Sequence, residues 1–231
     1  MPAAASFRVG GLSPHSSCDW PGQLVATVFA QGCPWACAYC HNPHLLPARG
    51  SEEIAWEEVL AFLRSRHGLL DGVVFTGGEP TLQDALVPAI ADVRALGFGV
   101  GLHTGGQFPE RLAKVLPQVD WIGFDVKAPL SAYDRITGIS GSGEVARASL
   151  ALIVESGVPF EARTTVHPAL LSADDLAALA DELVHAGVRR YAVQGFRQQG
   201  CLGGLPAASL TQANLPAGLA DGFEQFEVRE S

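Results

Sequence analysis

The stretch Gln31-Gly32-Cys33-Pro34-Trp35-Ala36-Cys37-Ala38-Tyr39-Cys40-His41-Asn42-Pro43 places three cysteines at CxxxCxxC spacing, with an aromatic residue directly before the third. Within one loop, their sulfurs can converge on one face of a small object. Thiolates are soft ligands that suit iron–sulfur clusters and zinc, and both centres normally take four protein ligands. This loop supplies three, which leaves an open position of the kind that a catalytic centre needs. We therefore expect Cys33, Cys37 and Cys40 to be metal ligands.

A zinc site is the alternative interpretation of the same loop. His41 or His44 could then serve as the fourth ligand. Both histidines lie close to Cys40, which does not match the usual spacing of paired zinc knuckles. The spacing therefore favours an iron–sulfur centre over zinc.

Length and charge narrow the class of protein. The chain has 231 residues and a formal net charge of −9, which fits one domain over 1–231 with a core at about 19–196 and an irregular C-terminal tail over 197–231. The acidic balance argues against a nucleic-acid partner. Neither a signal peptide nor a run of ~18 apolar residues is present, so we expect no membrane partner and a cytoplasmic protein.

Cysteine usage points to the same compartment. Three of the five cysteines lie in one loop, which leaves Cys18 and Cys201 with no argued role. Such a distribution is not a secreted disulfide framework and fits a reducing environment.

Short apolar runs alternate with amphipathic segments along most of the chain. The N-terminal segment 13–22 is expected to be a loop that ends in the turn Asp19-Trp20-Pro21-Gly22, and Ser51 to cap the first helix. Six strand-then-helix steps imply parallel strands joined by right-handed crossovers, and six are too few for a closed eight-stranded barrel. We therefore expect an α/β fold, an open partial (β/α)6 TIM-like barrel. The strands are expected over 24–30, 72–75, 99–103, 121–126, 160–166 and 191–194, and helices over about 83–96, 110–116, 144–156 and 174–186.

Polar residues and glycines cluster where the expected strands end. Because active sites of parallel barrels lie at the carboxyl ends of the strands, these residues are expected to converge on one mouth. A plain glycine turn is the alternative interpretation of the group after the second strand, and a surface ion pair is the alternative for the group at the fourth strand. In strand order, the groups are Gly77-Gly78-Glu79 after the second strand, His103-Thr104 at the third, Asp125 and Lys127 at the fourth, and Arg163 near the end of the fifth.

Taken together, these motifs resemble the radical S-adenosylmethionine (SAM) superfamily from about Asp19 to Phe196. The run Cys40-His41-Asn42-Pro43 resembles its glycyl-radical-activating branch. The sequences of residues 123–129 (GFDVKAP) and 163–168 (RTTVHP) most resemble those of the activating proteins of anaerobic ribonucleoside-triphosphate reductase. The resemblance implies two cofactors, a [4Fe–4S] cluster and S-adenosylmethionine.

The resemblance also implies roles for the residues at the mouth. The three cysteines would each hold one iron, and Gly77-Gly78-Glu79 matches the motif that binds the methionine amino group. Tyr39 matches the aromatic position beside the adenine, and Asp125, Lys127 and Arg163 match positions that line the cofactor pocket. His103-Thr104 stands where the pyruvate formate-lyase activase has Asp-Thr, so a cation beside the cofactor is in doubt. His103 is either a hydrogen-bonding replacement or a satisfied neutral histidine, and Phe196 stands where that activase has a histidine.

By this resemblance the protein is an enzyme that cleaves S-adenosylmethionine reductively to a 5′-deoxyadenosyl radical. That radical would abstract hydrogen from a glycine of a partner enzyme, which is expected to be anaerobic ribonucleotide reductase. A flavodoxin- or ferredoxin-type protein is the expected electron donor. No catalytic side chain is named, because the cofactors carry the chemistry.

Three other functions are alternatives. One is a radical SAM enzyme that acts on a small heterocycle, and another is a non-catalytic zinc or iron–sulfur module. The last is a barrel enzyme with acid–base chemistry from Asp125, Lys127 and His103, which leaves the cysteines unexplained.

Overall fold

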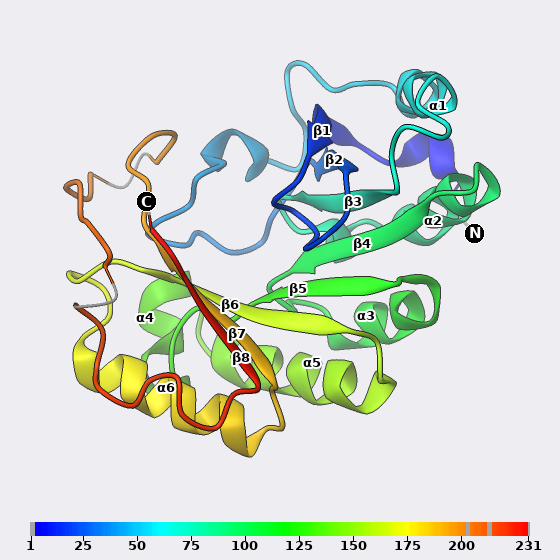
Figure 1. Cartoon of the computed structure of the whole chain (residues 1–231). Coiled ribbons are helices and arrows are strands. Elements are labelled where there is room, and N and C mark those ends of the chain that lie inside the picture. Colours follow the sequence, from blue (N-terminus) through cyan, green and yellow to red (C-terminus); the bar gives the residue numbers. More distant parts are fainter. Residues whose placement is uncertain (1–2, 202–203, 212–213, 231) are drawn as a thin grey trace.

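The computed structural model describes residues 3–201, 204–211 and 214–230. These residues form one curved sheet of eight strands, in which the order of the strands follows the chain (Figure 1). The first strand is antiparallel to the second, and all later neighbours are parallel. The strands are β1 (Val9–Ser16), β2 (Val25–Ala30), β3 (Gly72–Gly77), β4 (Gly99–Thr104), β5 (Trp121–Asp125), β6 (Phe160–Val166), β7 (Arg190–Gly195) and β8 (Gln225–Arg229).

Helices connect the parallel strands from β2 to β7 and cover one face of the sheet (Figure 1). In the first of them, Trp56, Val59, Leu60 and Leu63 are buried, which is the spacing of an apolar stripe facing a core. The described α-helices are α1 (Trp56–Arg64), α2 (Leu86–Ala95), α3 (Pro109–Val115), α4 (Tyr133–Thr137), α5 (Ser142–Ser156) and α6 (Ala173–His185).

The predicted α/β class with parallel strands is confirmed. Each of the six predicted strands is present, within a few residues of its expected bounds. Apolar, β-branched runs such as residues 72–75 (GVVF) form strands that are buried on both faces, as expected between helices and a barrel interior.

Three expectations about local structure were wrong, and one short helix was missed. Part of the segment expected to be a loop belongs to β1, which pairs with β2 despite Pro14. The tail expected to be irregular contains β8, which pairs with β7. Ser51 does not cap α1, whose N-cap is Ala55, because the chain first forms a bridge between Ile54 and Val9. The short helix α4 was not predicted.

Among the described residues, no helix is long and apolar enough to cross a membrane.

The loop that follows β3 lies directly against the start of the cysteine loop. The amide of Gly78 donates to the carbonyl of Ala30 at 2.9 Å, and the amide of Glu79 donates to the carbonyl of Gly32 at 2.9 Å. A Cβ at Gly78 would lie 2.3 Å from the Gly32 carbonyl oxygen, and Gly77 has a φ of 104°. Here the glycines therefore allow two backbone segments to pack directly against each other.

This contact predicts a large loss of stability for Gly78→Ala. The added methyl would overlap backbone atoms that cannot rotate away, so we expect the free energy of unfolding to fall by about 2 kcal/mol or more. Gly11→Ala is the matched control, because a Cβ there would meet atoms no closer than 3.7 Å. Chemical denaturation of both variants measures the effect, and equal stability of the two would contradict the account.

Candidate functional site

The three cysteine thiols line one pocket at the carboxyl ends of the parallel strands. The cysteine loop follows β2, and β3, β4 and β5 contribute the other walls. The structure therefore brings together the side chains that the sequence analysis predicted to converge. The predicted residues that line this pocket are Cys33, Cys37, Cys40, Tyr39, Gly77, Gly78, Glu79, His103, Thr104, Asp125 and Lys127. Arg163 is not a lining residue and acts on the pocket through Asp125.

Burial favours the neutral form of two of these thiols, those of Cys33 and Cys37. Burial, and then the nearby Glu79 carboxylate, raise the pKa of Cys33 to about 12, and burial raises the pKa of Cys37. Metal binding would have to displace these protons. Within the described residues, no group of three or more His, Cys, Asp or Glu side chains is arranged to hold a single metal ion. An iron–sulfur cluster makes a different demand, since each cysteine ligates a separate iron.

Glu79 organises the floor of the pocket. One carboxylate oxygen, Oε1, accepts hydrogen bonds from the Thr81 amide at 3.0 Å, the Thr81 hydroxyl, and the Thr104 hydroxyl at 2.8 Å. Oε2 accepts from the Gly105 amide at 3.2 Å. Burial raises the pKa of Glu79 while these donors oppose the rise. Because a carboxylate has about four acceptor positions, Oε2 keeps capacity for one more donor.

Asp125 joins two cations at the edge of the pocket. Its Oδ1 accepts from Arg163 at 2.8 Å, and its Oδ2 from the Lys127 ammonium at 3.2 Å. Burial alone would raise the pKa of Asp125, but the two cations hold it well below its usual range. Burial would lower the pKa of Lys127, yet the Asp125 carboxylate raises it well above normal. Asp125 and Lys127 are therefore both charged at neutral pH, and Lys127 keeps donors for a ligand.

Arg163 lies opposite Asp125 in the pairing of β5 with β6, and its guanidinium packs over Gly123 of β5. A Cβ at Gly123 would lie 2.7 Å from the guanidinium of Arg163. The guanidinium also lies 3.2 Å from Nε2 of His103. Arg163 is thus fixed in the barrel interior as a support for the pocket.

His103 is a neutral histidine that ties the strand end to the N-terminal turn. Its Nε2 lies 2.7 Å from the carbonyl of Asp19, and the Asp19 carboxylate accepts from Thr27 at 2.7 Å. Burial and the Arg163 cation lower the pKa of His103 to about 3. Of the two roles considered for this residue, the geometry favours the satisfied neutral histidine, although its ring still lines the pocket.

Phe196 packs between two imidazoles beside the cysteine loop. The His41 ring stacks on it at 5.7 Å, and the His167 ring meets it edge-on at 5.0 Å. Nε2 of His41 accepts a hydrogen bond from the Arg197 amide at 3.4 Å. This nitrogen is therefore engaged within the protein and is not directed at the thiols.

Two buried polar atoms at the pocket have no hydrogen-bond partner among the described residues. They are the hydroxyl of Tyr39 and Oε1 of Gln107. Buried polar groups are normally paired, so these atoms indicate that a polar ligand completes the site. With three thiols, a carboxylate and a lysine around them, the donor set fits an iron–sulfur cluster and a zwitterionic cofactor.

Several lining residues were missed by the sequence analysis. Gln107 carried no recognisable motif, although its place just after a strand end could have drawn attention to it. The others are Trp35, Asn42, Leu46, Thr76, Gly105 and Thr165.

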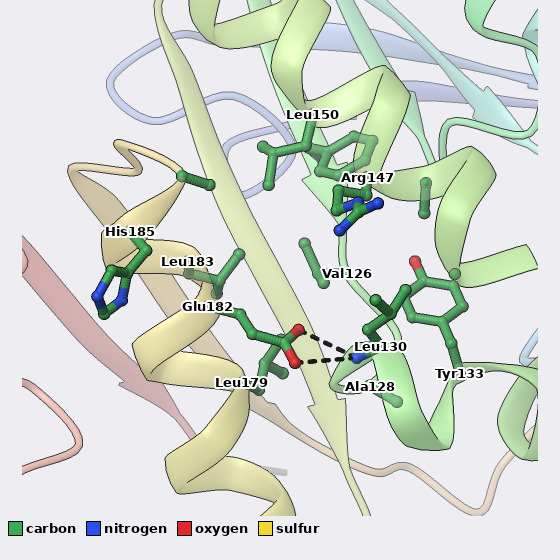
Figure 2. Close-up of a pocket in the computed structure, with 14 residues that line it drawn as sticks. Val126, Ala128, Leu130, Tyr133, Arg147, Leu150, Leu179, Glu182, Leu183 and His185 are labelled. Carbon is green, nitrogen blue, oxygen red and sulfur yellow. Dashed lines mark hydrogen bonds between the residues drawn. The ribbon is translucent and has the colours of Figure 1, made fainter.

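A separate cavity of about 460 Å³ lies on the opposite face of β5, between α5 and α6 (Figure 2). Its walls are mainly apolar, and Phe124 and Val126 form part of them. The backbone amide of Leu130 donates to both carboxylate oxygens of Glu182, at 3.3 Å to Oε1 and 3.0 Å to Oε2 (Figure 2). Its described lining residues include none of the predicted site residues.

The folded-state pKa of His103 predicts a dependence of stability on pH. Since unfolded histidine titrates near 6.5 and folded His103 near 3, the unfolded state takes up the proton first as the pH falls. The stabilisation is therefore complete above pH 6.5 and is lost below it. We expect the stability advantage of the wild type over His103→Gln to shrink by about 2 kcal/mol between pH 7.5 and 5. Denaturant titrations at each pH measure this, and a difference independent of pH would contradict it.

Comparison with known proteins agrees with this geometry. MJ1227 of Methanocaldococcus jannaschii, which its name places among the glycyl-radical enzyme activating enzymes, is 28% identical over 198 residues, covering 81% of this chain and 79% of that protein. The pyruvate formate-lyase-activating enzyme of Clostridium pasteurianum is 31% identical over 137 residues, covering 57% of each chain. This chain thus matches only about three fifths of the length of the second relative.

Solved structures of other proteins share this fold. QueE from Escherichia coli superposes with a TM-score of 0.58 at 18% identity, covering 97% of this chain and 94% of that one. At this identity the likeness concerns the fold alone, and it supports the predicted partial barrel. The family model of the Radical SAM superfamily matches residues 27–183. Because this match covers more than half of the chain, the protein belongs to the radical SAM superfamily, whose cofactors are a [4Fe–4S] cluster and S-adenosylmethionine.

Proposed function

We propose that this protein activates a glycyl-radical enzyme by generating a radical on a glycine of that partner. The observation that carries the proposal is the pocket in which the three cysteines meet Glu79 and the Asp125–Lys127 pair. The names of the two sequence relatives support the same branch of the superfamily.

In this proposal Cys33, Cys37 and Cys40 each hold one iron of the cluster. One iron would then have no cysteine ligand, which would leave it open to S-adenosylmethionine. When bound, the cluster supplies the electron that cleaves S-adenosylmethionine to methionine and a 5′-deoxyadenosyl radical. The protein binds the cluster and S-adenosylmethionine and orients them for this reaction.

The polar residues of the pocket suit the charges of this cofactor. Oε2 of Glu79 has capacity for a donor such as the methionine ammonium, and the Lys127 ammonium can donate to the carboxylate. Arg163 keeps Asp125 ionised, so that Asp125 can accept from a ribose hydroxyl. The unpaired Tyr39 hydroxyl adds one polar group at the wall.

The proposed partner is anaerobic ribonucleotide reductase, and the proposed donor of electrons is a flavodoxin- or ferredoxin-type protein. The similarity of residues 123–129 and 163–168 to the activating proteins of that reductase supports the choice of partner. A glycine loop entering an open barrel mouth would place its Cα near the cofactor.

Isotope transfer tests this function. The anaerobically reconstituted protein is incubated with S-adenosylmethionine, a reductant and an anaerobic ribonucleotide reductase whose glycines carry deuterium on Cα. We expect deuterium in the 5′-deoxyadenosine and a glycyl radical signal in the reductase, because the hydrogen atom moves from glycine to the 5′ carbon. A reductase with the radical-bearing glycine replaced by alanine is the control.

The other outcomes separate the alternatives. Cleavage of S-adenosylmethionine without deuterium transfer from any glycyl-radical enzyme would contradict glycine activation and favour a small heterocyclic substrate. Bound zinc without any cleavage would favour a non-catalytic module.

A further inference from the structure

The side chain of Gln107 reaches the cysteine loop from the opposite wall of the pocket. Gln107 lies in the turn between β4 and α3, and its Nε2 lies 3.9 Å from the sulfur of Cys33. Both residues line the same pocket. The amide is therefore within hydrogen-bonding reach of one proposed iron ligand.

The backbone is anchored at the two residues directly before Gln107. The Gly105 amide donates to Glu79 at 3.2 Å, and the Gly106 amide donates to the Thr104 hydroxyl at 3.0 Å. The carbonyl of Gly106 accepts from the Ser149 hydroxyl at 2.7 Å. A turn fixed in this way restricts where the glutamine side chain can lie.

The amide itself occupies a confined space beside Trp35. A Cβ at Gly105 would lie 3.1 Å from Oε1 of Gln107, 3.3 Å from its Nε2 and 3.1 Å from the Trp35 ring. The glycine therefore makes room for the amide next to the indole.

Within the described residues, the acceptor of this partly buried side chain is unpaired. Oε1 of Gln107 is buried and has no hydrogen-bond partner. An apolar side chain of the same size would fill the space without leaving an acceptor unpaired. The neighbouring sulfur supplies a reason for an amide, since a metal-bound thiolate accepts hydrogen bonds and cannot donate them. That fact also fixes the orientation of the amide, with its N–H toward the sulfur.

We propose that Gln107 is a positioning residue whose amide N–H donates to the Cys33 sulfur of the assembled iron–sulfur centre and raises its reduction potential. Hydrogen bonds to cluster sulfurs stabilise the more negative, reduced state. The inference rests on the cluster of the proposed function and is independent of the identity of the substrate. Oε1 of Gln107 remains available to accept from a donor of the bound ligand.

The test is the reduction potential of the reconstituted wild-type protein and of Gln107→Met, measured by redox titration followed by electron paramagnetic resonance. Methionine keeps the length of the side chain and removes the donor. We expect the reduction equilibrium to become about tenfold less favourable, which corresponds to about 59 mV for a one-electron couple. Gln118→Met is the matched control, because the Gln118 amide donates to the exposed Lys114 carbonyl away from the pocket and should leave the potential unchanged.

A potential for Gln107→Met equal to that of the wild type, at equal iron content, would overturn the proposal. Gln107→Leu guards against a local packing defect, and it should lower the potential in the same direction. If neither variant binds iron while the wild type and Gln118→Met do, Gln107 is needed for assembly of the centre and the proposed tuning role is wrong. Failure of the wild type itself to bind a cluster would instead refute the proposed function.

Discussion

The two backbone hydrogen bonds from Gly78 and Glu79 to Ala30 and Gly32 hold the cysteine loop against the end of β3. Parallel pairing of β2 with β3 brings Ala30 opposite Gly77, so the residues that follow the two strands run side by side. This close approach excludes a side chain at residue 78. The thiols and the Glu79 carboxylate consequently face one pocket, on which the proposed chemistry depends.

The charges around that pocket are arranged before any ligand arrives. Burying an unpaired charge is costly, and the Asp125 carboxylate is paired with two cations. Asp125 offers one oxygen to Arg163 and the other to Lys127, while neutral His103 lies beside the guanidinium without adding a charge. A zwitterionic ligand therefore meets groups that are already ionised and oriented, which reduces the free energy needed to organise the site.

The sequence predicted the elements that carry strong local signals. The run at residues 72–75 is apolar and β-branched, so it identified a buried strand, and strand order then predicted which side chains would converge. β1 and β8 were missed because pairing with a neighbouring strand, and not local composition, determines them. β1 contains Pro14 and two serines, and β8 follows a region rich in glycine and proline. The same limit applies to the site, since Gln107 belongs to no motif and only the fold brings it near Cys33.

The central claim is that three cysteines leave one iron open to S-adenosylmethionine. The most direct measurement is the electron paramagnetic resonance spectrum of the anaerobically reconstituted, reduced protein, recorded before and after addition of S-adenosylmethionine. The account predicts about four irons per chain and a cluster signal whose g-values shift when S-adenosylmethionine binds, with both lost in Cys37→Ala and kept in Cys18→Ala. A protein that binds no cluster, or a cluster signal that S-adenosylmethionine leaves unchanged, would contradict it.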